Sequence, residues 1–331
     1  MKRTEKRKQK KKQRLRKILL GIFLFFLLIF GYGVYMTIDA YQAVNESYDD
    51  LGREKSDLRE EPVAIIEDPF SVLLLGIEDY SSGGKNGRTD AILVATFNPD
   101  DQRVKLLSIP RDTLVEINEE GRLGKINSAH VFYGIEGTIK TVEKFLDIPI
   151  DYYAAVDFDG FVNIVNILGG VEVNVPFDFS QDSLDGKMYY FYEGKMELNG
   201  DEALAFVRMR KQDPEGDIGR NKRQQEVIKG IVDKAFSLST ITKINDIADE
   251  IGENVQTNFR VIDGPGLMKQ WSGFSNSQID TVELVTYSDR YNGASVQIVD
   301  PESLEEVQTI LKEHLGLSNT KNSVDNVSVT N

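Results

Sequence analysis

The 331-residue sequence predicts an α/β fold in which a mixed central sheet lies between helical layers, preceded by one transmembrane helix. Short strand-like runs alternate with helix-like segments along most of the chain. Hydrophobic residues make up 40% of the sequence, which is enough at this length to build a sizeable core. The uncharged run Ile18–Met36 is long enough, at about 1.5 Å per residue, to cross a bilayer as a helix.

The N-terminal region combines this apolar run with a basic tail. Residues 1–17 carry eleven Lys and Arg side chains and one acidic side chain, and basic residues beside a span favour the cytoplasmic side. A cleaved signal peptide is the alternative, but its apolar region has only about 7–15 residues and ends at a small-x-small site, which is missing here. We therefore expect a cytoplasmic tail (1–17), a transmembrane helix (18–38) and an extracellular remainder, as in a single-pass cell-membrane protein.

The part after the span divides into three segments. Residues 39–64 are polar and charged and predict a juxtamembrane helix or stalk. Residues 65–315 form the globular body, and residues 316–331 form a flexible tail rich in Ser, Asn and Thr. Beyond residue 17 the chain carries 28 basic and 52 acidic side chains, so we do not expect it to bind nucleic acid.

The body opens with three apolar runs that predict strands at 71–77, 91–97 and 104–109, with a five-residue turn at 98–102. In the segments that follow, apolar residues recur every 3.6 residues in some and every second residue in others. This indicates helices and strands in mixed order. These elements are a helix at 128–146, a strand at 152–156, a helix at 159–168 ending at two glycines, a strand at 171–175, helices at 200–209, 220–237, 240–251 and 302–314, and a strand at 281–287.

Charged side chains fall at the ends of the first three strands. If these strands pair as antiparallel neighbours, Glu78 and Asp79 come near Arg88 and Asp90, and the third strand returns Arg111 to the same edge. Mg²⁺ prefers one or two carboxylates together with phosphate oxygens, and arginines bind the remaining phosphate oxygens. This edge therefore predicts a magnesium and phosphate site, with solvated loop charges as the alternative.

A second group of charges lies on two later helices. The stripe of apolar residues at 227–236, continued towards the N-terminus, directs Arg220, Arg223 and Gln224 inward, and Arg208 shares a helix face with Leu204. Buried guanidinium groups need partners, so this pattern predicts a phosphate or pyrophosphate ligand. The alternative is a buried network with acidic residues of the same region. Those residues are Asp213, Glu215 and Asp217.

The composition limits the chemistry that such a site performs. The chain has no cysteine, which excludes disulfides, thiol nucleophiles and cysteine-bound metals, and only two histidines. Catalysis would therefore depend on carboxylates, arginines and oxygen-bound metal ions.

Five segments together resemble one protein family. The segments are LLLGIEDYSSGGKNGRTDAILV, LSIPRDT, GKINSAHVFYG, FDGFVNIVNILGGVEV and NGDEALAFVRMRKQDPEGDIGRNKRQQEVI. They resemble the LytR-CpsA-Psr family of Gram-positive cell-envelope phosphotransferases, in particular its teichoic-acid ligases. The resemblance implies an enzyme that moves an anionic glycopolymer from a polyprenyl-pyrophosphate carrier in the membrane to a peptidoglycan hydroxyl, through a phosphodiester bond.

The resemblance also implies roles for single residues. It makes Arg111 and Asp90 catalytic and implies a Mg²⁺ ion, with Mn²⁺ as the other candidate. Asp90 would hold the ion with Asp79 or Glu78, and Glu78 stands where many family members have Asp. The implied pyrophosphate-binding set is Arg88, Arg111, Arg208, Arg210, Arg220, Arg223 and Gln224.

Three questions stay open at the level of the sequence. The same arginines would serve a non-enzymatic regulator of the envelope that senses lipid-linked precursors, or a hydrolase in which water replaces the acceptor. Either Asp90 or Asp112 is available to accept the proton of the attacking hydroxyl. The apolar faces of 158–168 and 227–236 form either a tunnel for the polyprenyl chain or ordinary core.

Overall fold

The computed structural model describes residues 48–78, 87–118, 121–235, 255–260 and 263–317. The predicted tail, the predicted transmembrane helix at 18–38 and the predicted helix at 240–251 lie outside these ranges. None of the helices within them is both long and apolar enough to span a membrane.

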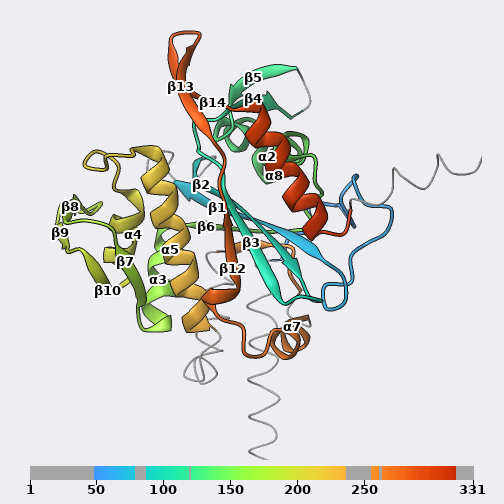
Figure 1. Ribbon diagram of the computed structural model, residues 1–331, viewed down its shortest axis with the longest axis horizontal. Coiled ribbons are helices and arrows are strands. Elements are labelled where there is room, and N and C mark those ends of the chain that lie inside the picture. The colour runs from blue at the N-terminus through green and yellow to red at the C-terminus, as the bar shows by residue number, and fades with distance from the viewer. Residues whose placement is uncertain (1–47, 79–86, 119–120, 236–254, 261–262, 318–331) are drawn as a thin grey trace, which may run out of the picture.

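A six-stranded mixed sheet forms the centre of the molecule (Figure 1). Strands β1 (Phe70–Glu78), β2 (Arg88–Asn98) and β3 (Arg103–Ser108) are consecutive antiparallel neighbours, which confirms the predicted pairing. Strand β6 (Tyr152–Asp157) lies parallel to β1, and β12 (Ile279–Val282) lies parallel to β3. The short β11 (Val255–Thr257) closes the β6 edge in antiparallel orientation.

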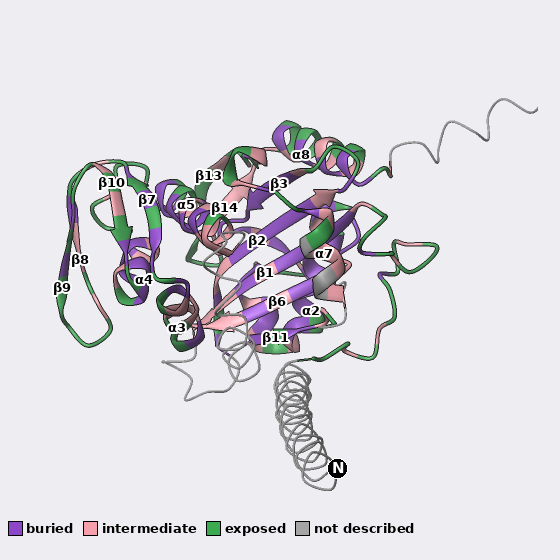
Figure 2. Ribbon diagram, turned by 90° about the horizontal axis from the view of Figure 1, so that it is seen from below, coloured by how far each residue is buried: buried purple, intermediate pink, exposed green. Residues whose placement is uncertain are grey.

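The two faces of the sheet pack against different helices. Alternation along β1 sends Leu73 and Leu75 into the main core, where helices α2 (Ser128–Leu146) and α8 (Pro301–His314) cover the sheet. On the other face Leu93 and the neighbouring strands pack against α7 (Gly264–Gln270) and part of α5 (Asp217–Ala235). Figure 2 shows the strands between these layers as mostly buried.

A smaller group of elements lies beside the sheet, on the left of Figure 1. It contains helices α3 (Phe158–Leu168) and α4 (Gly200–Arg208) and the strand pairs β7 (Val171–Val175) with β10 (Gly194–Leu198) and β8 (Phe179–Asp182) with β9 (Met188–Phe191). Phe179, Phe191 and Phe206 form its aromatic centre. This group and α5 enclose the space over the second face of the sheet.

Three predicted elements need adjustment. The single strand predicted at 281–287 is wrong, because β12 ends at Val282 and β13 (Thr286–Tyr291) pairs instead with β14 (Ala294–Val299) in a separate hairpin. The helix predicted at 220–237 begins earlier, at Asp217. The helix at 128–146 has the predicted bounds, but Gly134, with φ of 64°, kinks it after its first turns.

A further small hairpin is formed by β4 (Leu114–Ile117) and β5 (Arg122–Lys125).

The described part of the predicted stalk, from Tyr48 onward, forms turns that pack onto the body. Arg53 binds Glu143 at 2.7 Å, and Arg59 forms a forked pair with Asp151, with N–O distances of 2.8 and 3.0 Å. Asp151 also accepts a hydrogen bond from the backbone N–H of Ser71 at the start of β1. One buried carboxylate thus ties residues 48–64 to the first strand of the sheet.

We expect Asp151→Ala to lower the free energy of unfolding by about 3–5 kcal/mol, because it leaves the half-buried Arg59 guanidinium without its forked partner. Denaturant titration of a chain that includes residues 48–64 measures this loss. The matched control is Glu172→Ala, which removes an exposed ion pair with Lys195 and should cost less than about 1 kcal/mol. Equal losses in the two variants would contradict a structural role for the segment 48–64.

Candidate functional site

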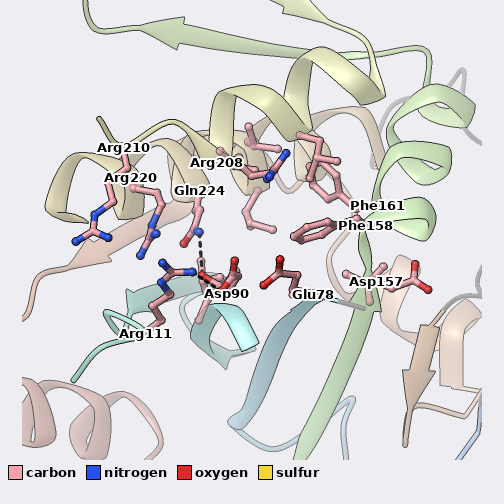
Figure 3. Close-up of a pocket in the computed structure, with 18 of the residues that line it drawn as sticks. Glu78, Asp90, Arg111, Asp157, Phe158, Phe161, Arg208, Arg210, Arg220 and Gln224 are labelled. Atoms are coloured by element: carbon pink, nitrogen blue, oxygen red, sulfur yellow. Dashed lines mark hydrogen bonds and ion pairs between the residues drawn. The ribbon is translucent and has the colours of Figure 1, made fainter. Parts of the chain in front are cut away.

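A cavity of about 1080 Å³ lies between the sheet and helices α3, α4 and α5 (Figure 3). Its walls are predominantly apolar and come from the sheet and all three helices. Three arginines gather at one end of it, where Figure 3 shows Arg111, Arg210 and Arg220 together, and the carboxylates of Glu78 and Asp157 lie farther along. The apolar lining residues include Leu74, Ala91, Leu93, Ala154, Val156, Phe158, Phe161, Ile164, Leu204, Val207, Val227, Ile228 and Ile231.

Helix α5 contributes both kinds of lining residue from one face. Arg220, Gln224, Ile228 and Ile231 all line the cavity, at the spacing of successive helical turns. The polar pair lies on the first turns and the apolar pair lies farther along the helix. The faces of α3 and α5 that the sequence offered as a tunnel or as core therefore enclose an open space.

Strand β2 places Asp90 at the charged end of the cavity through a bulge. The pairing of β1 with β2 shifts between Gly76 and Ile77, so Asp90 has no partner in the register. Ile92 and Val94 face the main core. If side chains alternated strictly along β2, Asp90 would face the main core too. The extra residue reverses this direction and turns the carboxylate into the cavity.

Asp90 and Arg111 form the first ion pair of the site. The Arg111 guanidinium donates to Oδ1 of Asp90 at 2.5 Å, and the amide of Gln224 lies 3.5 Å from the backbone carbonyl of Asp90 (Figure 3). Burial lowers the pKa of Arg111, but the carboxylates of Asp90, Asp112 and Asp217 outweigh burial and raise the pKa above its ordinary value. Arg111 therefore carries a positive charge at every physiological pH.

Asp217 forms the second ion pair, between two arginines. Its carboxylate lies 2.8 Å from guanidinium nitrogens of both Arg210 and Arg220. Arg220 is only 5% exposed, and burial lowers its pKa despite Asp217, with the positive charges of Arg111 and Arg210 acting in the same direction as burial. The Nε atoms of Arg111 and Arg220 are buried and have no hydrogen-bond partner among the described residues, so both retain a donor for an anion.

Two further arginines line the cavity away from this pair. The Arg208 guanidinium lies 5.6 Å from the ring centroid of Phe158, at the border between the charged and apolar parts. Arg88 is exposed and lies opposite Glu78 in the pairing of β1 with β2, and both residues line the cavity. Six of the seven predicted pyrophosphate-binding residues therefore line one cavity.

Arg223, the seventh, lies elsewhere, and its assignment to the pyrophosphate site is corrected. It is 2% exposed, pairs with the Asp213 carboxylate, and donates to the backbone carbonyls of Phe206 and Met209. These contacts occupy its donors in the aromatic centre between α4 and α5. For Arg223 the alternative of a buried network with an acidic residue is therefore the right one, because its side chain leaves α5 on the face turned away from the cavity.

The carboxylates suit a magnesium ion that shares its ligands with phosphate. Glu78 and Asp90 both point into the cavity in Figure 3, whereas Asp79 lies outside the described residues. No group of three acidic or histidine side chains among the described residues could hold a metal by itself. Since Mg²⁺ is usually bound by one or two carboxylates together with substrate phosphates and water, two carboxylates beside a phosphate site are a fitting donor set.

Sequence reasoning placed Asp217 only in an alternative network, and the structure shows that it organises the site. The available signal was its position three residues before Arg220 in the first turn of a helix, where i and i+3 side chains meet. Lys125 and Asp112, in contrast, bind each other at 2.7 Å, and neither is among the residues lining the cavity.

Comparisons with known proteins agree on one family. The model of the LytR_cpsA_psr family matches residues 34–313. The polyisoprenyl-teichoic acid–peptidoglycan teichoic acid transferase TagV of Bacillus subtilis (strain 168) is 46% identical over 293 residues, which cover 86% of this chain and 74% of TagV. The corresponding TagU of Halalkalibacterium halodurans is 41% identical over 88% of this chain and 94% of its own length.

Solved structures show the same relationship. The crystal structure of B. subtilis TagV has a TM-score of 0.68 and 44% identity, covering 76% of this chain and 98% of that one. The structure of TagT bound to LIIa-WTA also has a TM-score of 0.68, with 34% identity. The match covers 81% of this chain and 99% of that one.

We expect Asp217→Asn to make the protein depend on an added anion for its stability. The substitution leaves two close guanidinium groups without their carboxylate, so its melting temperature should fall and then recover more than that of the wild type when inorganic pyrophosphate is added. Thermal unfolding at increasing pyrophosphate measures this difference.

Asp213→Asn is the matched control, because it removes the partner of Arg223 outside the cavity. It should also lower the melting temperature but should show no additional recovery with pyrophosphate. The same response to pyrophosphate in both variants would refute the assignment of the anion site to Arg210 and Arg220.

Proposed function

Because the chain belongs to the LytR-CpsA-Psr family, we propose that it is a polyisoprenyl-teichoic acid–peptidoglycan teichoic acid transferase. The observation that carries this function is a single cavity that is apolar along most of its length and lined by arginines at one end. A lipid-linked pyrophosphate has the same two-part chemistry. The chain thus acts as a phosphotransferase on a polymer carried by such a lipid.

The apolar part of the cavity holds the polyisoprenyl chain. Residues such as Phe161 of α3, Leu74 of β1 and Ile231 of α5 surround it with hydrocarbon from three sides. Burying an isoprenoid chain there is favourable by about 25 cal/mol for each Å² of apolar surface removed from water. This part of the site supplies affinity for the carrier and leaves the pyrophosphate at the arginine end.

The arginine end holds the pyrophosphate and stabilises the charge that builds up on it. Arg220 and Arg111 each offer a buried Nε donor, and Arg208 lies where the apolar and charged parts meet. Forked guanidinium contacts of this kind are strongest in a site shielded from water. The counter-charges of Asp90 and Asp217 hold the guanidinium groups in place before the lipid arrives.

In the transfer step the acceptor hydroxyl oxygen attacks the polymer-bearing phosphorus in line. A new phosphorus–oxygen bond forms, the bond to the bridging oxygen of the pyrophosphate breaks, and the polyisoprenyl phosphate leaves with the electron pair. Asp90 faces the cavity, whereas Asp112 is bound to Lys125 and does not line it, so of these two carboxylates we assign Asp90 the proton of the attacking hydroxyl.

Asp90 and Glu78 are also the residues that would hold a Mg²⁺ or Mn²⁺ ion, with Asp79 as the further candidate. Such an ion, when bound, neutralises negative charge on the pyrophosphate. Asp90 itself orients Arg111 through their ion pair.

The cellular location follows from the same substrate. A polyisoprenyl carrier lies in the membrane and peptidoglycan lies outside it, so we place the body on the outer surface of the cell membrane. The apolar run at 18–38 is its single transmembrane helix, with the basic residues 1–17 in the cytoplasm.

We expect Arg111→Ala and Arg220→Ala each to reduce transfer of polymer to peptidoglycan by about 10²–10³-fold, because each removes a preorganised charge from the reacting phosphate. The measurement is the rate of transfer from a lipid-linked precursor, with folding checked by thermal unfolding. Lys195→Ala removes an exposed charge distant from the cavity and is the control, with unchanged transfer expected. Hydrolysis of the precursor by the wild type without any transfer would instead identify a hydrolase.

We expect Asp90→Asn to raise the Mg²⁺ concentration needed for half-maximal transfer, while the purified protein still retains the lipid. The substitution removes a candidate metal ligand but leaves the apolar walls and the other arginines. Glu78→Gln is the companion variant, because it should shift the Mg²⁺ dependence without breaking the pair between Asp90 and Arg111. Loss of lipid with an unchanged Mg²⁺ response in Asp90→Asn would show that this residue only orients Arg111.

A further inference from the structure

The β8–β9 hairpin presents one packed face and one exposed face. On the packed face the rings of Phe179 and Phe191 stack at 4.7 Å, and Phe179 also stacks on Phe206 of α4 at 5.8 Å. Tyr189 is buried in the same cluster. These contacts pack the hairpin against α4 and leave its other face exposed.

The outer face exposes three large side chains next to one another. Met188 is 44% exposed, and Tyr190 and Tyr192 are each 62% exposed. Strand alternation places Met188 and Tyr190 on one side, and Tyr192 follows at the next alternate position. Tyrosines with two rotatable bonds provide rigid contact area at a small cost in entropy, which is typical of binding surfaces.

This face continues into the mouth of the cavity. Ser180, Asp182 and Met188 line the cavity, and Tyr190 lies directly opposite Ser180 in the strand pairing. Gln212, two residues after Arg210, donates to the backbone carbonyl of Ser180 at 2.7 Å. The tyrosines therefore form an outer extension of the site near the loop that carries Arg210, at the side of the molecule shown on the left of Figure 1.

The hairpin is rich in carboxylates, which disfavours an anionic ligand on its outer face. Residues 178–193 contain four carboxylates and one basic side chain, Lys187, whose ammonium lies over the ring of Tyr189. The resulting negative charge repels the anionic polymer of the donor and anionic lipid headgroups. A sugar chain fits this surface. It stacks on tyrosines, bonds to the nearby hydroxyl, carboxylate and amide groups, and carries no negative phosphate. The four carboxylates are Asp178, Asp182, Asp185 and Glu193.

We propose that the face formed by Met188, Tyr190 and Tyr192 binds the glycan strand of the acceptor and guides its hydroxyl to the arginine end of the cavity. This assignment depends on the proposed transferase function. The flat C–H faces of the sugar rings stack on the two phenol rings, and the sugar hydroxyls bond to Ser180, Asp182 and Gln212. The donor enters through the apolar part of the cavity, so the two substrates approach the phosphorus from different sides.

The test compares Tyr190→Ala, Tyr192→Ala and the double variant with Tyr190→Phe, all in the full chain in detergent. The double variant should raise the KM for soluble uncrosslinked peptidoglycan strands by about tenfold, equivalent to about 1.4 kcal/mol, with kcat, the KM for the lipid donor and the melting temperature unchanged. Tyr190→Phe keeps the ring and should behave as the wild type. Tyr287 on β13 is 53% exposed, so Tyr287→Ala is the matched control and should change neither constant.

A binding measurement separates this proposal from the proposed function. Titration of the full chain with N-acetylglucosamine oligosaccharides, measured by isothermal titration calorimetry, should show weaker binding in the double variant even if no transfer is detected. Unchanged acceptor KM and unchanged oligosaccharide binding would overturn the proposal. So would a rise in the donor KM alone, which would assign the face to the donor polymer, or weaker binding only to vesicles containing phosphatidylglycerol, which would assign it to the membrane.

Discussion

Buried guanidinium groups at the end of an apolar cavity are the constraint on which this structure depends. Charge in a site shielded from water is costly unless a counter-charge lies within contact distance. Asp90 provides that counter-charge to Arg111, and Asp217 provides it to Arg210 and Arg220. These pairs offset the cost of burying the charges without a ligand, and two Nε donors remain without a hydrogen-bond partner among the described residues.

The two faces of the sheet have different roles: one packs into the main core and the other lines the cavity. Leu73 and Leu75 on one face pack into a continuous core with α2 and α8, which supplies stability without any contribution from the site. Leu74 and Glu78 of the same strand face the cavity. The bulge at Asp90 adds one carboxylate to the cavity face without disturbing the core face, since the regular register resumes at Ala91.

Helix α5 divides two arginine pairs in a similar way. The pair of Arg223 with Asp213 lies in the aromatic centre beside α4, where backbone carbonyls occupy its remaining donors. The pair of Arg220 with Asp217 lies one turn earlier and faces the cavity. Both are pairs of an arginine with an aspartate. The pair of Arg223 holds α5 to α4, whereas the pair of Arg220 lies at the proposed anion site. The difference lies in what covers each face of the helix.

The sequence by itself determined the elements whose signals are local. Period-3.6 apolar residues predicted the helix at 128–146 with its observed bounds, and alternation predicted the strand at 171–175. Taken as antiparallel neighbours, the first three strands also placed Asp90 and Arg111 at one edge of the sheet, and the structure has this pairing. Tertiary structure decided the rest. Arg220 and Arg223 share one stripe in the sequence, and only the packing of α4 beside α5 separates them. The bulge at Asp90, the break between β12 and β13 and the exposed face of β8–β9 depend on partners distant in the chain, so no local pattern could have specified them.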